Sequence, residues 1–122
     1  MIDHFKEVSE FAKLEIPESH KLPIAIVGAG GIVDGAHLPA YKKAGLEIVG
    51  ITDVDQDRAK DVANRHGIPI VYPDLATLLR DSKAKVIDIA VPPAVQRDVF
   101  VEVAKSGRHI LAQKPLATTV GD

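Results

Sequence analysis

Residues 23–33 have the sequence Pro-Ile-Ala-Ile-Val-Gly-Ala-Gly-Gly-Ile-Val, an apolar run that ends in closely spaced glycines. Such a run predicts a short strand that is buried on both faces of a sheet. Glycines directly after a strand allow a tight turn into a helix, and they bring no Cβ atom between the backbone and a ligand. The free N–H groups at the start of that helix favour a phosphate group. The stretch therefore predicts a strand, a turn and a helix that together suit the pyrophosphate of a dinucleotide.

Asp53 adds a second signal at the end of the next apolar run, about 20 residues beyond the turn. Its carboxylate can accept hydrogen bonds from both ribose hydroxyls of an adenosine, and it repels a 2′-phosphate. Val54 offers no cation to hold such a phosphate, so the sequence favours NAD over NADP. Two plainer explanations stay open, because the glycines could mark only a tight turn and Asp53 could cap the next helix.

Apolar runs recur along the rest of the chain at a regular interval. Five of them suit the buried strands of a parallel sheet, at residues 24–27, 47–52, 69–72, 86–91 and 109–112. The intervening segments have helical patterns, at residues 31–44, 55–66, 74–80 and 95–106. Asp74 is expected to cap the third of these helices, and Gly107 to end the fourth. The alternation predicts an α/β fold with a doubly wound, Rossmann-like parallel sheet in three α/β/α layers.

The two ends of the chain differ from this alternating region. Residues 1–22 place apolar residues at helical spacing before a polar segment with Pro17, which predicts an amphipathic helix and a linker joined to a domain at residues 23–122. Near the other end, Thr119 is followed three residues later by Asp122, as at the start of a further helix. The domain is therefore expected to lack its last strand or strands, and a second domain with them.

The composition excludes several classes of function. A net charge of −2 gives no electrostatic basis for binding nucleic acid or an anionic membrane surface. The chain has no cysteine and five scattered histidines, so we expect no thiolate chemistry and no metal site. No apolar run reaches the roughly 18 residues that span a bilayer, and the N-terminus does not resemble a signal peptide. A cytoplasmic protein without membrane partners is the expectation.

Five short motifs occur in a fixed order with fitting spacings. They are Ile-Val-Gly-Ala-Gly-Gly-Ile at 26–32, His-Leu-Pro-Ala-Tyr at 37–41, Thr-Asp at 52–53, Val-Pro-Pro at 91–93 and Gln-Lys-Pro-Leu at 113–116. With these motifs, residues 22–122 resemble the N-terminal half of the Gfo/Idh/MocA oxidoreductases, the relatives of glucose-fructose oxidoreductase and inositol dehydrogenase. The resemblance implies an NAD(P)-binding Rossmann domain from a dehydrogenase of sugars, cyclitols or related polyols. It also implies a C-terminal α/β domain that shapes the substrate pocket and mediates oligomers.

The same resemblance implies roles for individual residues. The segment Val91-Pro92-Pro93 is expected along the ribose and nicotinamide of the cofactor, and Lys114 near nicotinamide and substrate. An ammonium group there can stabilise an oxyanion or take part in a proton relay, which makes Lys114 the candidate catalytic residue. The plainer alternatives are an exposed lysine and a stiff proline loop. The residues expected to bind cofactor are Gly28, Ala29, Gly30, Gly31, Ile32, Val33, Asp53, Val54, Ala90, Val91, Pro92, Pro93, Gln96, Gln113 and Lys114.

Three residues depart from the family pattern. Gln113 stands where the family usually has Glu, and Gln96 stands where many members have His. Val33 replaces the small third residue of the glycine motif, so the first helix is expected to approach the first strand less closely. The two glutamines could alter the substrate preference or the chemistry. His37 is expected to anchor the segment around Pro39 rather than to catalyse, because a proline interrupts a helix.

The expected function is that of the NAD-binding domain of an oxidoreductase, which transfers a hydride between a nicotinamide cofactor and a sugar, cyclitol or polyol-like alcohol. The parent protein is expected to be a homo-oligomer with a small-molecule substrate. The second domain normally supplies the general base and most substrate contacts. By itself this chain is therefore expected to bind cofactor weakly or not at all, and to be inactive. The alternatives are a non-catalytic NAD-binding sensor or regulatory module, and a doubly wound domain that binds another nucleotide or none.

Overall fold

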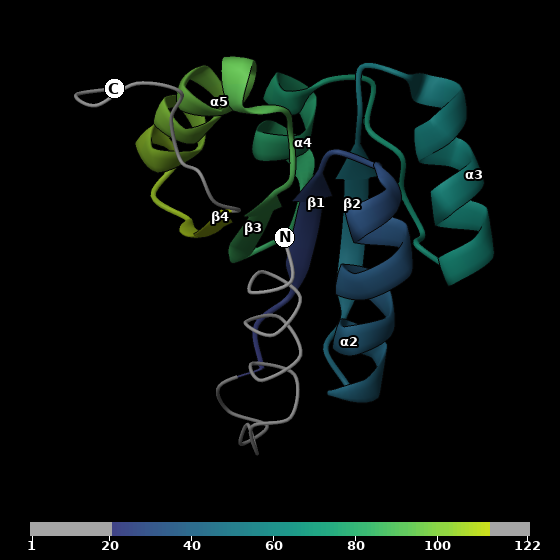
Figure 1. Cartoon of the computed structure of the whole chain (residues 1–122). Helices are drawn as coiled ribbons and strands as arrows, with labels where there is room; N and C mark the ends of the chain where they lie inside the picture. The colour runs from purple at the N-terminus through teal and green to yellow at the C-terminus, as the bar shows by residue number, and fades with distance from the viewer. Residues whose placement is uncertain (1–20, 113–122) are drawn as a thin grey trace.

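The computed structural model describes residues 21–112, which form a parallel four-stranded sheet with helices on both faces (Figure 1). The strands are β1 (Ile24–Val27), β2 (Ile48–Thr52), β3 (Val86–Ile89) and β4 (His109–Ala112). Their order is β2-β1-β3-β4, and each neighbouring pair is parallel. The chain winds from β1 out to β2 and then returns to the other side of β1. The sheet is thus doubly wound, and its direction of winding changes between β1 and β3.

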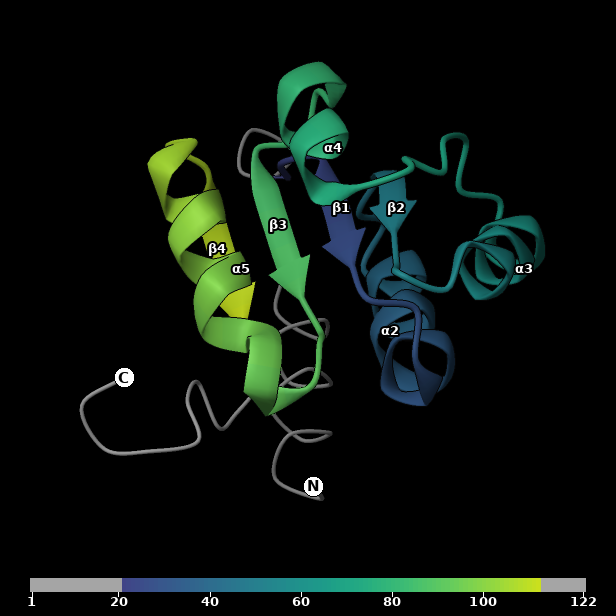
Figure 2. The same cartoon turned by 90° about the horizontal axis from the view of Figure 1, so that it is seen from above.

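The helices form the two outer layers expected from the sequence. On one face lie the π-helix η2 (Val33–His37), α2 (Leu38–Lys43) and α3 (Gln56–His66), and on the other lie α4 (Leu75–Asp81) and α5 (Pro93–Lys105) (Figure 2). Alternate residues of β1 enter the two cores: Ile24 and Ile26 pack on the first face, whereas Ala25 and Val27 pack on the second. The continuous apolar run of β1 is therefore explained by burial on both faces.

The first helix widens into a π-turn just before Pro39. The N–H of Leu38 bonds to the carbonyl of Val33, five residues back, and helical structure then continues to Lys43. A proline ring has no N–H and crowds the preceding turn, so the interruption predicted at Pro39 takes the form of this wider turn. His37, the last residue of the π-turn, is buried and bonds to Asp88 of β3. It anchors the segment, as the sequence predicted.

The prediction of a strand at residues 69–72 is wrong. Only a single bridge forms there, between Val71 and Ile51 of β2. The N–H of Ile51 bonds to the carbonyl of Ile70 at 3.0 Å, and the N–H of Tyr72 bonds to the carbonyl of Ile51 at 2.8 Å. Pro69 and Pro73 bracket this segment, and the carbonyl of Tyr72 accepts from the side-chain hydroxyl of Thr52 at 2.8 Å rather than from a backbone N–H of β2.

The remaining predicted elements are present, and several bounds differ. Helix α5 begins at Pro93 rather than two residues later, because a proline is well tolerated at the first helical position. Strand β3 correspondingly ends at Ile89. Asp74 caps α4 by accepting from the N–H of Thr77 at 2.8 Å, and Gly107 follows α5 with a φ of 76°. The predictions for the N-terminal helix and for the helix start at Thr119 lie outside the described residues. Within residues 21–112, no helix is long and apolar enough to cross a membrane.

Candidate functional site

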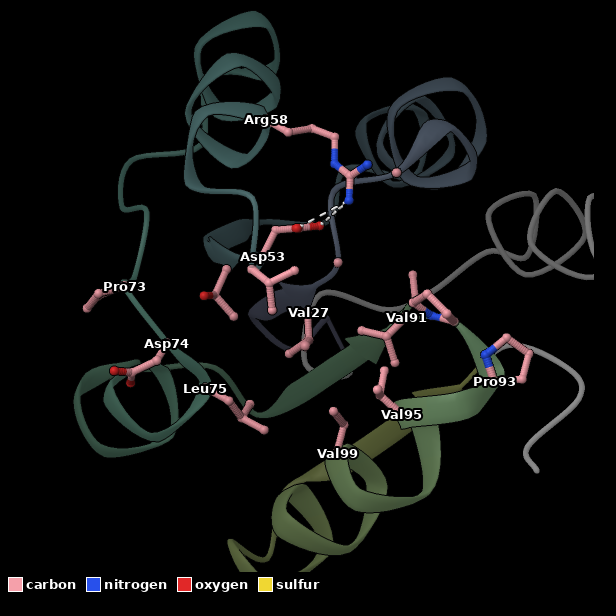
Figure 3. A pocket seen from close by; sticks show the side chains of 16 residues that line it. Val27, Asp53, Arg58, Pro73, Asp74, Leu75, Val91, Pro93, Val95 and Val99 are labelled. Atoms are coloured by element: carbon pink, nitrogen blue, oxygen red, sulfur yellow. Dashed lines mark hydrogen bonds and ion pairs between the residues drawn. The ribbon is translucent and has the colours of Figure 1, made fainter. Parts of the chain in front are cut away.

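A cleft of about 610 Å³ opens at the carboxyl ends of β1, β2 and β3 (Figure 3). This volume lies in the range of small-molecule pockets, and the position is the one where doubly wound sheets bind ligands, beside the change in winding. Its walls come from the ends of three strands, the glycine turn after β1, and the starts of α3, α4 and α5. The lining residues are Val27, Gly28, Gly30, Thr52, Asp53, Val54, Arg58, Pro73, Asp74, Leu75, Ala90, Val91, Pro92, Pro93, Val95 and Val99.

Two glycines of the turn after β1 differ in what a Cβ atom would meet at each position. Gly28 has a φ of 110°, and a Cβ atom there would lie 2.2 Å from the carbonyl oxygen of Ala90. The fold itself therefore requires glycine at position 28. A Cβ atom on Gly30 would meet nothing within 4 Å, and its φ is not positive, yet Gly30 lines the cleft. The bare backbone at position 30 thus leaves room for a ligand, which fits the close approach of a pyrophosphate to a helix start.

Asp53 is held against the glycine turn from its position directly after β2. Its Oδ2 accepts from the N–H of Ala29 at 2.6 Å, and its Oδ1 accepts from the N–H of Asp55 at 2.7 Å. Burial by itself would raise the pKa of Asp53, but these two hydrogen bonds and the nearby Arg58 outweigh it and lower the pKa. The N-cap of α3 is Asp55, which accepts from the N–H of Arg58 at 3.1 Å. Asp53 is therefore not the helix cap.

Arg58 lies in the first turn of α3, and its side chain extends over the carboxylate of Asp53. Its Nη2 lies 3.2 Å from Oδ1 and 3.1 Å from Oδ2, and the side chain is half exposed to solvent along the cleft (Figure 3). It supplies the only cationic side chain among the described residues that line the cleft. The sequence argument considered only Val54 as a possible partner for a 2′-phosphate. The sequence could have indicated Arg58, which lies five residues after Asp53. The first turn of a helix that follows a strand lies close to the end of that strand, so a long side chain there can reach the site.

Apolar side chains form most of the remaining wall. Val54 is fully exposed at the mouth of the cleft, and Val91 and Val95 line the side formed by β3 and α5. Valines and prolines in such an opening suit a ligand with flat, weakly polar rings. Within the part of the chain that the structure describes, no cluster of His, Cys, Asp and Glu could hold a metal ion.

The cleft gathers about half of the residues predicted to bind cofactor. Eight of them line it: Gly28, Gly30, Asp53, Val54, Ala90, Val91, Pro92 and Pro93. Ala29 contributes through its bond to Asp53. Four others are not among the lining residues, namely Gly31, Ile32, Val33 and Gln96, of which Val33 and Gln96 are buried. Gln113 and Lys114 lie outside the described residues. Arg58 and three residues around the start of α4, Pro73, Asp74 and Leu75, line the cleft although they were not predicted.

Comparisons with known proteins agree with this architecture. A family model described as an oxidoreductase family with an NAD-binding Rossmann fold matches residues 22–122. Inositol 2-dehydrogenase of Rubrobacter xylanophilus is 30% identical over 102 residues, which cover 82% of this chain and 29% of that protein. A D-xylose 1-dehydrogenase (NADP⁺) of Haloferax volcanii is 31% identical over 97 residues, covering 80% of this chain and 30% of that protein.

A solved structure shows the same fold. The WlbA dehydrogenase of Bordetella pertussis, crystallised with NADH and UDP-GlcNAcA, matches with a TM-score of 0.75 and 28% identity over 81% of this chain and 30% of that one. The chain thus spans about a third of the length of the relatives it matches. The fold, the position of the cleft and the family match agree, and the chain belongs to the Gfo/Idh/MocA oxidoreductase family, as its NAD-binding Rossmann domain.

Proposed function

We propose that this chain is the NAD(H)-binding domain of a dehydrogenase that acts on a sugar, a cyclitol or a similar polyol. The observation that carries the proposal is the contact between Asp53 and the glycine turn, 2.6 Å from Oδ2 to the N–H of Ala29, inside the cleft. This contact joins an acceptor for ribose hydroxyls to a backbone suited to phosphate. Asp53 is not the helix cap and Gly30 is not required by the packing, so both plainer explanations lose their support.

Different residues of the cleft would contact different parts of the cofactor. The bare backbone at Gly30, at the start of the first helix, would hold the pyrophosphate. Asp53 would accept the ribose hydroxyls, and Val54 with Pro73 would flank the adenine. Val91 and Pro92, at the carboxyl end of β3, would border the ribose on the nicotinamide side. These assignments are supported by the fact that all of these residues line the cleft.

The chemistry is divided between cofactor and protein. The nicotinamide ring, when bound, supplies the acceptor or donor of a hydride. We assign Lys114, two residues beyond β4 in the sequence, to the alcohol being oxidised. An ammonium group there would stabilise negative charge on the substrate oxygen or pass on its proton. In a protein of the relatives' length, Lys114→Ala is expected to lower kcat more than it lowers cofactor affinity.

The assignment of NAD(H) is tested in a protein of the relatives' length that contains this domain, by titration with NADH and NADPH while nicotinamide fluorescence is followed. Saturable binding of NADH is expected, and Asp53→Ser is expected to weaken it and to reduce discrimination against NADPH, since serine has no charge to repel a 2′-phosphate. The matched control is Asp57→Ser, which removes an exposed carboxylate from the first turn of α3 outside the cleft. Absence of saturable NADH binding, or an unchanged ratio of the two affinities in Asp53→Ser, contradicts the assignment.

A further inference from the structure

The carboxylate of Asp53 has no acceptor position left for a ribose. An ionised carboxylate offers about four lone-pair directions, two on each oxygen. The N–H groups of Ala29 and Asp55 use one on each oxygen, and Nη2 of Arg58 lies within 3.2 Å of both. The Asp53 side chain is accordingly only 5% exposed, although it lines the cleft. Two ribose hydroxyls can bond to it only if one of these donors moves away.

Arg58 is the donor that can move. Ala29 and Asp55 donate from the backbone, and their positions are fixed by the glycine turn and by the start of α3. Arg58 donates from the end of a long side chain that is 50% exposed, so its contact with Asp53 is easily exchanged for water or for another partner. Displacement by ribose hydroxyls exchanges one set of donors to Asp53 for another and leaves a guanidinium at the rim of the cleft.

We propose that Arg58 determines how strongly this site discriminates between a 2′-hydroxyl and a 2′-phosphate on the adenine ribose. When ribose hydroxyls take its place on Asp53, the guanidinium remains at the rim of the cleft beside Asp53 and can pair with a 2′-phosphate. A guanidinium fork matches phosphate oxygens well. Arg58 thereby offsets the repulsion that Asp53 exerts on NADP(H), and the site accepts both cofactors with a preference for NAD(H). The inference rests on the proposed NAD(H) function and concerns its specificity.

The charges around the cleft determine the direction of the effect. Asp53 and Asp74 both line it, so without Arg58 the side chains that line the cleft carry negative charge and no positive charge. Removal of the guanidinium therefore penalises NADPH far more than NADH. Substitution of Asp53 shifts the preference in the opposite direction. Substitutions of Asp53 and of Arg58 are thus expected to change the ratio of the NADPH and NADH dissociation constants in opposite directions.

The test compares dissociation constants of NADH and NADPH in a protein of the relatives' length that contains this domain, as the unmodified protein and as its Arg58→Ala, Arg58→Lys and Lys60→Ala variants. Nicotinamide fluorescence gives the constants, and the backbone amide shifts of Ala29 and Gly30 provide a second readout. Arg58→Ala is expected to raise the ratio of the NADPH constant to the NADH constant about tenfold, the loss of one charged hydrogen bond. Arg58→Lys retains the charge without the fork, so a smaller increase is expected.

Lys60→Ala removes the same charge from an exposed position on the same helix, outside the cleft, and is expected to leave the ratio unchanged. An unchanged ratio in Arg58→Ala, or an equal change in Lys60→Ala, overturns the role of Arg58 while NADH binding still supports the proposed function. If neither cofactor binds the unmodified protein, the proposed function itself fails and the specificity role fails with it. Thermal unfolding of each variant verifies that the fold is retained.

Discussion

Nδ1 of His37 lies 2.7 Å from Oδ2 of Asp88 in the interior of the protein, between the first helix and β3. The hydroxyl of Tyr41 donates to the same oxygen at 2.7 Å, and all three side chains are almost fully buried. Burial and the adjacent Asp88 carboxylate raise the pKa of Tyr41, so its hydroxyl stays protonated and remains a donor. The cluster connects the helix that follows the glycine turn to the strand that leads into Val91 and Pro92. It thus links, through the core, two elements whose ends lead to the cleft.

Replacement of Asp88 is expected to destabilise the fold strongly. Asp88→Ala leaves two buried donors without their shared acceptor, and we expect the free energy of unfolding to fall by about 3 kcal/mol. Asp88→Asn retains one acceptor oxygen and is expected to lose less. Urea unfolding measures both, with Asp98→Ala as a control that removes an exposed carboxylate from α5. Equal stability of Asp88→Ala and the control would show that the cluster does not hold the two elements together.

Alanine substitutions at Gly28 and Gly30 are expected to affect different properties, stability in the first case and NADH affinity in the second. Gly28→Ala places a methyl group 2.2 Å from the Ala90 carbonyl at a positive φ, so a loss of about 3 kcal/mol or more in unfolding free energy is expected. Gly30→Ala meets no atom of the protein, and its stability is expected to stay within about 0.5 kcal/mol. Its affinity for NADH is nevertheless expected to fall, because the methyl group occupies the cleft. A destabilised Gly30→Ala, or one that binds NADH as well as the unmodified chain, contradicts this division.

The lowered pKa of Asp53 predicts a specific pH dependence of stability. A carboxylate whose pKa is lower in the folded state stabilises the fold above its ordinary unfolded pKa, near 4, and this contribution is lost as pH falls through the folded value. Asp53→Asn lacks the contribution. The difference in unfolding free energy between the unmodified chain and Asp53→Asn is therefore expected to shrink below about pH 4. Urea unfolding at pH 7, 4 and 3 measures it, and Asp57→Asn is the matched control. Parallel curves for the unmodified chain and Asp53→Asn would exclude the predicted contribution.

Local patterns in the sequence were sufficient for much of the fold. Burial on both faces makes a parallel strand continuously apolar, and caps such as Asp74 mark helix starts, so both leave signals within a few residues. The strand at residues 69–72 was predicted wrongly because its apolar residues satisfy the pattern. The number of backbone hydrogen bonds that the segment forms depends instead on its geometry at the edge of the sheet, where a single bridge to Ile51 is present.

The sequence by itself determined the glycine turn and Asp53, because a tight turn after a buried strand and an acid at the end of the next strand are features of local chain geometry. Only the tertiary structure decided what surrounds them. It distinguished Gly28, which must avoid Ala90, from Gly30, which has open space, because the two differ in their backbone φ and in the atoms that surround them. It also brought Arg58 onto Asp53. Such contacts depend on how a helix packs on a strand, and no pattern along the chain specifies the direction in which a long side chain then extends.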